Sequence, residues 1–367
     1  MIRTAEAVLD GHADRFCDLL ADAVLIEGYR VDSECFAQIE VGIWRREVWF
    51  SGFLVSKNPL GKSLQQIVKE TGEMVGLPPR DYSILSHIKF IEEDSSIHPR
   101  GVDDQSIVIG WAGYDAKTDY LAPEQYLVRR LRTGLIDSMR RGSLQGKGPD
   151  GKLLVVLKED SLGFTLETVI ATIQHSAETD HLHLISSVSE ALSEVYESLR
   201  RADGRWRAPW GDVKVLVNPN GPLITACSDG DNGQTGRKLV MSFYGPRVPI
   251  GGGAIHGKDL GHIDRLGSYA TRAAAVEAVK SGAKECRISA IYAAGLNDPI
   301  ELRVESSGSK SSLSPADFSY ERMREHFYPK DDLDLKSEIG TGEIGLVATR
   351  PYESAIQKNI GNLTISG

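Results

Sequence analysis

Residues 229–238 read DGDNGQTGRK, and residues 251–259 read GGGAIHGKD. Glycine lets backbone N–H groups approach phosphate oxygens closely, and lysine and arginine neutralise the charge of those oxygens. Aspartate holds Mg²⁺, which binds through one or two carboxylates together with the phosphates themselves. Both segments therefore have the composition of a polyphosphate site, although either one alone is more often a solvated turn.

Polar segments of the same kind occur elsewhere in the chain. Residues 10–15 read DGHADR, residues 101–105 read GVDDQ, and Lys152, His262 and Asp264 are further polar residues near such segments. None contains the GxxxxGK[ST] motif of P-loop enzymes, or a GxGxxG placed between a strand and a helix. These patterns disfavour a P-loop NTPase, a Rossmann dinucleotide enzyme and a protein kinase. The residues alone indicate a magnesium-dependent polyphosphate enzyme and go no further.

Composition limits the class of protein. The 367 residues include 42 lysines and arginines and 51 aspartates and glutamates, which gives a net charge of −9. Such a chain lacks the basic surface that a general nucleic-acid binder needs. No apolar run approaches the roughly 18 residues of a membrane span, and Cys17, Cys35, Cys227 and Cys286 form no CxxC pair. We therefore expect a cytoplasmic protein of two or three structural units, without a disulfide framework or a cysteine zinc site.

Hydrophobic periodicity and turn residues predict alternating helices and strands. Helices are predicted over 15–28, 62–76, 124–141, 183–201, 269–280 and 315–326. Strands are predicted over 35–41, 47–55, 106–112, 153–157, 164–174, 213–217, 287–292 and 300–305. The helix over 124–141 has a basic face, and the tail after the last helix shows no clear period. This order of elements predicts an α+β fold.

The polar segments, taken in order, resemble the S-adenosylmethionine synthetase (methionine adenosyltransferase) family. The family opens with Glu-Gly-His-Pro-Asp-Lys, to which residues 10–15 are similar, and its Gly-Ala-Gly-Asp-Gln loop is similar to residues 101–105. Its Pro-Asp-Ala-Lys is similar to residues 149–152. Its Gly-Asp-x-Gly-x-Thr-Gly-Arg-Lys and Gly-Gly-Gly-Ala-Phe-Ser-Gly-Lys-Asp are similar to residues 230–238 and 251–259. Several long motifs in one order make this resemblance, which runs from about residue 4 to about residue 305, highly specific.

The resemblance implies a fold, a reaction and an assembly. The fold would be α+β, with three similar sheet-plus-helix subdomains related by a pseudo-threefold axis. The subdomains would cover about 1–95, 101–222 and 223–367 and interleave. In the reaction, the methionine sulfur attacks the 5′ carbon of ATP, and tripolyphosphate leaves and is cleaved to pyrophosphate and phosphate. The family uses two Mg²⁺ ions and K⁺, and its homodimers, or dimers of dimers, have active sites at the interface.

The resemblance also implies roles for individual residues. Asp14 and Asp264 correspond to the Mg²⁺ ligands, and Glu40 to the acid of the potassium site. His12 corresponds to the histidine near the 5′ oxygen and the triphosphate. The basic phosphate ligands correspond to Lys152, Arg237, Lys238 and Lys258. The residues implied to line the adenosine and methionine parts of the site are Asp104, Gln105, Asp150, Gln174 and Asp231.

The departures from the family concentrate away from the triphosphate. Phe53 stands where the family has the glutamate that meets the methionine ammonium, and His262 stands where it has a lysine. Leu223 aligns with the phenylalanine that stacks on adenine. Burial of an ammonium without its carboxylate partner costs on the order of several kcal/mol, because the lost hydration is not compensated by an ion pair. The acceptor is therefore either methionine, with Glu92, Glu93, Asp94 or Asp103 replacing the missing acid, or a methionine analogue or different nucleophile.

Two further hypotheses remain open from the sequence. The chain could be an ATP or tripolyphosphate hydrolase that kept the phosphate half of the site, or a nucleotide-binding protein without catalysis. Joint retention of the residues of the phosphate half argues against the second, because a decayed site would lose some of them. These residues are His12, Asp14, Lys152, Arg237, Lys238, Lys258 and Asp264. The nature of the product separates a transferase from a hydrolase.

Overall fold

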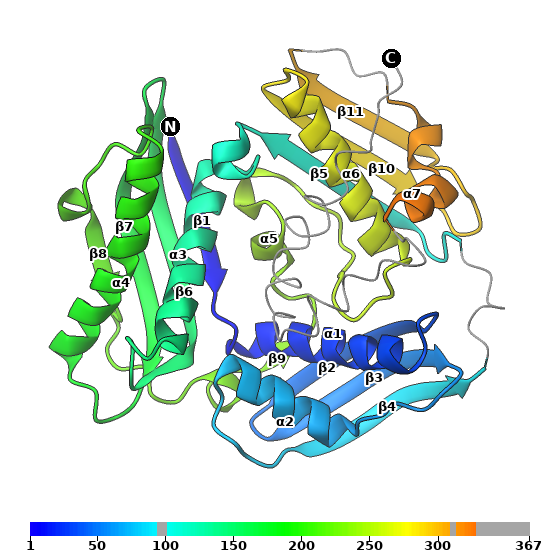
Figure 1. Ribbon diagram of the computed structural model, residues 1–367, viewed down its shortest axis with the longest axis horizontal. Coiled ribbons are helices and arrows are strands. Elements are labelled where there is room, and N and C mark those ends of the chain that lie inside the picture. The colour runs from blue at the N-terminus through cyan, green and yellow to red at the C-terminus, as the bar shows by residue number, and fades with distance from the viewer. Residues whose placement is uncertain (94–100, 309–312, 328–367) are drawn as a thin grey trace.

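The computed structural model describes residues 1–93, 101–308 and 313–327, with only the backbone of 326–327. Figure 1 shows three lobes, each built from one β-sheet with helices on one of its faces. The predicted α+β class is therefore confirmed. Asp94 and the tail beyond residue 327 lie outside the described residues.

The first sheet has the strand order β1-β6-β7-β8. Its strands are β1 (Ile2–Val8), β6 (Lys147–Asp160), β7 (Gly163–His175) and β8 (Lys214–Val217), and its helices are α3 (Pro123–Arg140) and α4 (His181–Ala202). Leu153 and Val155 of β6 pack with Leu131 of α3 and Leu192 of α4 in one apolar core. Alternate side chains of each strand reach this core, because neighbouring residues of a strand point to opposite faces.

The other two sheets are built in the same way. The second has the order β4-β3-β2-β9, with β2 (Phe36–Trp44), β3 (Glu47–Ser56), β4 (Ser83–Glu92) and β9 (Gly233–Gln234). Helices α1 (Ala13–Val31) and α2 (Leu64–Val75) cover one of its faces. The third has the order β11-β10-β5, with β5 (Ser106–Gly113), β10 (Glu285–Tyr292) and β11 (Glu301–Ser307). Helices α6 (Ile263–Lys280) and α7 (Tyr320–Phe327) cover it.

Short helices complete the described structure. They are α5 (Leu239–Ser242) and the 3₁₀ turns Ala116–Thr118, Trp210–Asp212, Cys227–Asp229, Gly245–Arg247 and Pro315–Phe318. No helix among the residues that the structure describes is long and apolar enough to cross a membrane.

Each sheet contains a strand from a distant part of the chain. β1 pairs with β6, so that Ile2 lies opposite Lys158. β5 pairs with β10 although more than 170 residues separate them, since Ser106 lies opposite Tyr292. β9 pairs with β2 through Gly42 and Gln234. The segments 1–95, 101–222 and 223–367 therefore each contribute one strand to the sheet of another segment.

Several elements differ from the sequence prediction. Helix α6 begins at Ile263 and not at residue 269, because His262 caps it and the polar residues of its first turns are buried. The helix predicted over 315–326 is divided by Ser319, whose backbone is extended, into a 3₁₀ turn and α7. Strands β1, β4 and β9 were not predicted. β4 has mostly exposed side chains and therefore lacks a clear apolar alternation.

The basic face predicted for the helix over 124–141 is partly internal. Arg129 and Arg132 of α3 are buried. Arg129 donates to the backbone carbonyls of Ser242 and Phe243, and Arg132 donates to the carbonyl of Val8 and pairs with Asp10. These arginines hold the loop that leads into α1 and the segment after α5. Arg130, Arg140 and Arg141 are exposed, so one part of this basic face fixes loops around the site and the other part is solvated.

Candidate functional site

The first part of the site forms at the N-terminus of α1. His12 is the N-cap residue, and its Nδ1 accepts a hydrogen bond of 3.2 Å from the backbone N–H of Asp14. A side chain that accepts from an N–H of the first turn satisfies one of the free donors of a helix end. The Asp14 side chain is 1% exposed. We call His12, Asp14, Asp150, Asp231, Arg237 and Lys238 the Asp14 centre.

Two cations converge on the carboxylate of Asp14. Lys238 Nζ pairs with Oδ2, and Arg237 Nη1 lies 3.4 Å from Oδ1. The backbone N–H of Gln234 also donates to Oδ1 over 2.9 Å. The loop approaches so closely because residue 233 is glycine, where an added Cβ would lie 2.3 Å from the carbonyl carbon of Ala13. The glycine-rich segment thus brings its basic residues onto the end of α1.

Asp150 of β6 and Asp231 of the loop before β9 complete the Asp14 centre, and both carboxylates act electrostatically on His12. Asp150 accepts from the backbone N–H of Cys227 over 2.6 Å, and its own N–H donates to Gln174 Oε1 over 3.4 Å. Burial raises the pKa of Asp150. Burial lowers the pKa of His12, although Asp150 and other acids oppose the shift. His12 is therefore neutral at pH 7, and because Nδ1 accepts a bond, Nε2 carries the proton.

The second part of the site forms in the same way at the N-terminus of α6. His262 is the N-cap residue, and its Nδ1 accepts from the N–H of Asp264 over 3.2 Å. Lys258 Nζ lies 2.5 Å from Asp264 Oδ2, and the Ser106 hydroxyl donates to Oδ1. Residue 253 is glycine, and an added Cβ there would lie 2.2 Å from Asp264 Cγ. We call Ser106, Lys258, His262 and Asp264 the Asp264 centre.

The two centres share one local sequence, Gly-His-x-Asp-Arg, at residues 11–15 and 261–265. In each copy the histidine caps the helix and the aspartate pairs with a lysine from a glycine-containing segment. His262 therefore departs from the family lysine but repeats the role of His12. The repeat was not predicted from the sequence, although it is visible when the chain is compared with itself.

The arginine of each repeat points inward and not towards a ligand. Arg15 is 3% exposed and donates to Asp18 over 3.1 Å and to the Ser242 hydroxyl over 2.8 Å. Arg265 is 4% exposed and donates to Asp22 over 3.2 Å. Asp18 and Asp22 lie one turn apart on α1, and His256 contacts both of them. In Figure 1, α1 lies along the lower sheet and the lower end of α6 points towards it.

Other predicted residues border these centres. Lys152 shares a face of β6 with Asp150, but its ammonium pairs with Glu6. Asp104 accepts from the N–H of Gln105 over 2.7 Å, immediately before Ser106 of the Asp264 centre. Leu223 meets the site through its carbonyl, which accepts from the N–H of His175 over 3.0 Å beside Gln174.

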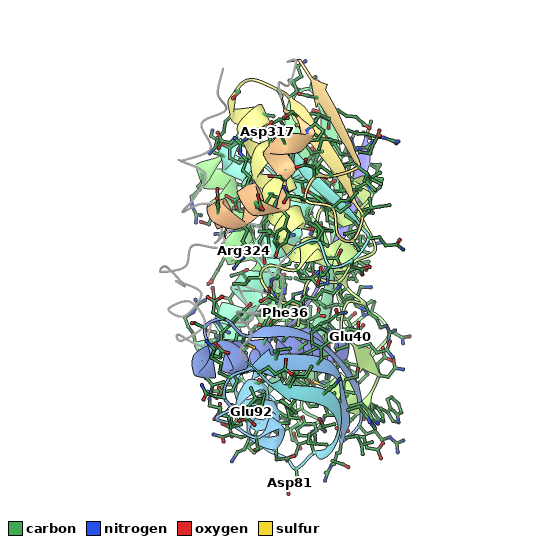
Figure 2. All side chains as sticks on the ribbon, turned by 90° about the vertical axis from the view of Figure 1, so that its right-hand side faces the viewer. Phe36, Glu40, Asp81, Glu92, Asp317 and Arg324 are labelled. Carbon is green, nitrogen blue, oxygen red and sulfur yellow. The ribbon has the colours of Figure 1, made fainter. Side chains whose placement is uncertain are left out.

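Phe53 lies near the Asp264 centre, on the face of the sheet that α1 and α2 leave uncovered. It pairs across the sheet with Gln38, and Gln38 in turn forms a β-bridge with Lys258. Its ring lies 5.5 Å from that of Phe36. Glu40 lies two residues after Gln38 and is exposed, and Figure 2 labels Phe36 and Glu40 on this strand. A role for Glu40 in a potassium site stays a prediction.

The structure has donors suitable for Mg²⁺, but only as single carboxylates. Among residues 1–93, 101–308 and 313–327, no group of three or more histidines, cysteines, aspartates or glutamates is placed to hold a metal. Asp14 and Asp264 each instead hold one lysine ammonium, which occupies the place of a cation. Mg²⁺ commonly binds one or two carboxylates plus substrate phosphates. The two aspartates therefore fit a metal that arrives with a polyphosphate.

Comparison with known proteins identifies the family. The model of the S-adenosylmethionine synthetase C-terminal domain matches residues 226–333. The S-adenosylmethionine synthase of Helicobacter hepaticus is 30% identical over 318 residues, which cover 83% of this chain and 80% of the relative. The synthase of Wolinella succinogenes is 28% identical over 318 residues, with 83% and 80% coverage.

The fold has a solved counterpart. A structure described as an unusual S-adenosylmethionine synthetase from Campylobacter jejuni superposes with a TM-score of 0.81, covering 98% of this chain and 99% of that one at 22% identity. This likeness confirms the predicted fold of three sheet-plus-helix subdomains. With the similarity to the Helicobacter hepaticus enzyme, it shows that the chain belongs to the S-adenosylmethionine synthetase family, as a divergent transferase of the methionine adenosyltransferase type.

Proposed function

We propose that the chain transfers the 5′-deoxyadenosyl group of ATP to the sulfur of methionine, and that the released tripolyphosphate is then hydrolysed to pyrophosphate and phosphate. The observation that carries this proposal is the pair of matching centres. Each places one buried aspartate and one lysine at a histidine-capped helix N-terminus. Helix N-termini and lysines favour bound anions. Two such centres suit a polyphosphate better than a single phosphate group.

The transfer step needs orientation more than proton transfer. A sulfur lone pair forms the S–C5′ bond while the C5′–O bond breaks. The electron pair of the broken C5′–O bond stays on the triphosphate oxygen. The thioether becomes a sulfonium ion, and no proton is lost. Catalysis then consists of in-line alignment and stabilisation of the charge that develops on the leaving oxygen. Arg237, Lys238 and Lys258 supply that positive charge.

His12 adds a neutral hydrogen-bond donor to the same centre. Its proton lies on Nε2, because Nδ1 accepts from the N–H of Asp14. Burial keeps the ring uncharged at pH 7. We assign it to donate to the leaving oxygen, where a donor already fixed in place stabilises the negative charge that develops.

Asp14 and Asp264 would each hold one Mg²⁺ when substrate is present. The ions would neutralise phosphate charge and so make the triphosphate a better leaving group. The lysines now paired with these carboxylates would then be released to the phosphate oxygens. Each lysine pairs with one carboxylate, Lys238 with Asp14 and Lys258 with Asp264, and has a flexible side chain. The exchange therefore needs no change of fold.

The active site is proposed to combine centres from two copies of the chain. Within one copy, Asp14 and Asp22 are eight residues apart on α1, or about 12 Å along the helix axis. Asp22, and not Asp14, accepts from Arg265, the residue that follows Asp264. A buried network fills the space between the two centres. Strands of the three sheets also expose large apolar side chains, namely Ile2, Trp44, Leu85 and Ile107, which are 40–57% exposed. A homodimer would cover them.

Methionine is the proposed acceptor, with Asp103 in place of the missing glutamate. Asp103 Oδ2 lies 3.8 Å from His262 Nε2 at the edge of the Asp264 centre, and its side chain is 35% exposed. It is therefore an available carboxylate at the Asp264 centre, to which Gln38 links Phe53 through its bridge to Lys258. One observation favours a second candidate: the Phe36–Phe53 ring pair makes this wall apolar. A thioether without an amino group would fit such a wall better than methionine.

The experiment is mass spectrometry of the products made by the purified protein from ATP, Mg²⁺ and K⁺. Parallel reactions contain methionine, or a thioether that lacks the amino group or the carboxyl group. S-adenosylmethionine in the methionine reaction is the expected result. An adenosylated product only from another thioether would favour the second candidate. Phosphate or tripolyphosphate without any sulfonium product would show a hydrolase and refute both.

A further inference from the structure

His256 is a buried histidine that the proposed chemistry does not use. It lies in the segment 251–259 and is 1% exposed. Its Nδ1 lies 2.9 Å from Asp22 Oδ2, and its Nε2 lies 3.3 Å from Arg15 Nη1 and 3.8 Å from Asp18 Oδ2. All three partners belong to α1. The ring therefore connects the segment that carries Lys258 to the helix that carries Asp14.

One tautomer satisfies both nitrogens of this ring. Arginine has no acceptor, so Arg15 must donate to Nε2. The proton then lies on Nδ1 and is donated to Asp22. Burial opposes the ionisation of Asp22, but Arg265, His256 and the N–H of Gly257 together hold its pKa well below the usual range. The ring thus links a guanidinium to a carboxylate.

The contacts of His256 reach both repeats of Gly-His-x-Asp-Arg. Arg15 directly follows Asp14 in the first repeat. Arg265 directly follows Asp264 in the second, and donates to Asp22 over 3.2 Å and to the carbonyl of Lys258 over 2.8 Å. Asp22 also accepts from the N–H of Gly257 over 2.8 Å. His256 therefore contacts Arg15, which follows Asp14, and also contacts Asp22. Asp22 in turn accepts from Arg265, which follows Asp264.

We propose that His256 is a positioning residue that sets the placement of the Asp14 centre relative to the Asp264 centre within the chain. The proposal deepens the proposed function and rests on it for the consequence in catalysis. The geometry itself does not depend on which acceptor is used. Since the two centres are proposed to serve different active sites of a dimer, a change at His256 disturbs both halves of each site.

The first test measures the local protection of backbone amides in the absence of any substrate. Hydrogen–deuterium exchange is compared for the wild type, His256→Leu and His256→Asn. Asparagine offers an N–H to Asp22 and an oxygen to Arg15, whereas leucine offers neither. Leu192→Ala is the control, because Leu192 is fully buried in the core of the first sheet, away from this network. His256→Leu is expected to speed exchange in 251–259 and in the first turn of α1, and Leu192→Ala in α4.

The second test measures the consequence by calorimetric binding of magnesium tripolyphosphate. Loss of a partner to buried charges is expected to weaken binding by about tenfold or more in His256→Leu. His256→Asn is expected to bind within about threefold of the wild type, and Leu192→Ala is expected to bind normally despite a lower melting temperature.

Two results would overturn the proposal. The first is unchanged exchange in 251–259 and α1 in His256→Leu. The second is a failure of His256→Asn to restore the wild-type pattern, since ring volume and not hydrogen bonding would then matter. A wild-type protein that forms no sulfonium product would refute the proposed function, but the exchange results would still decide the role of His256.

Discussion

Lys258 Nζ lies 2.5 Å from Asp264 Oδ2, and both side chains are nearly buried, at 10% and 9% exposure. The ammonium therefore occupies the position that a metal ion on that carboxylate would take. A buried carboxylate without a cation would be costly, so the lysine stabilises the free protein while it keeps the site available. Lys238 has the same relationship to Asp14.

Removal of this lysine should separate metal binding from phosphate binding. In Lys258→Met the ammonium no longer competes for Asp264, so Mn²⁺ used as a probe for Mg²⁺ should bind the free protein more tightly than it binds the wild type. The rate of adenosyl transfer should nevertheless fall by a factor on the order of 10²–10³, because a positive charge that stabilises the leaving triphosphate is lost. Electron paramagnetic resonance titration and product assays measure the two effects. Lys280→Met, at an exposed pair with Glu277, is the control and should change neither.

Mixing two inactive variants tests whether two chains form each active site. Asp14→Asn and Asp264→Asn should each be inactive alone. If every site takes its Asp14 centre from one chain and its Asp264 centre from the other, a hybrid dimer has one intact site. An equal mixture that exchanges subunits should then recover about a quarter of the wild-type activity. No recovery, with hybrid dimers detected by native mass spectrometry, would place both centres of a site in one chain.

The helix caps predict a dependence of stability on pH. Burial lowers the pKa of both His12 and His262 below their ordinary value of 6.5. The unfolded chain therefore binds more protons, and the free energy of unfolding should fall as pH drops below about 6.5, by at most about 1.4 kcal/mol per pH unit for each histidine. The double variant His12→Asn/His262→Asn keeps capping side chains and should show a shallower decline in urea titrations.

The matched control for that measurement is His181→Asn/His183→Asn, which alters two exposed histidines at the start of α4. Its stability should decline with pH as steeply as that of the wild type. An equal decline in the two double variants would show that the capping histidines do not cause the effect.

Asp103 is the expected partner of the methionine ammonium. Asp103→Asn should raise the KM for methionine by about tenfold or more, because a charged hydrogen bond is lost, while the KM for ATP stays near its wild-type value. Steady-state kinetics with each substrate varied in turn would show this. Glu92→Gln and Glu93→Gln are controls from the end of β4 and the residue after it. A selective rise in either of these variants would assign the ammonium to that residue instead.

The sequence predicts most of the long elements and much of the site. The helices of the first two lobes were predicted within a few residues, since their apolar faces follow the 3.6-residue period. Asp14 with Lys238, and Asp264 with Lys258, were predicted as site residues, and the structure brings each pair together. Their roles in catalysis stay predictions.

What the sequence could not predict has a common cause. The start of α6 was missed because its first turns are polar, and only tertiary contacts such as Arg265 with Asp22 bury them. β4 was missed because an edge strand with exposed side chains has no apolar alternation. Ser106 and His256 were missed because their partners lie more than 150 and more than 230 residues away in the chain. Periodicity describes local preference and carries no information on such pairs.

The exchange of strands between segments has a consequence for biosynthesis. β1 reaches its partner only when residues 147–160 have been made, and β5 waits for residues 285–292. Likewise β2 gains β9 only after residue 234 has been added. A chain growing on the ribosome can complete none of the three sheets early, and pairing between such distant segments is slow. Nascent chains should therefore remain dependent on chaperones until most of the polypeptide has emerged.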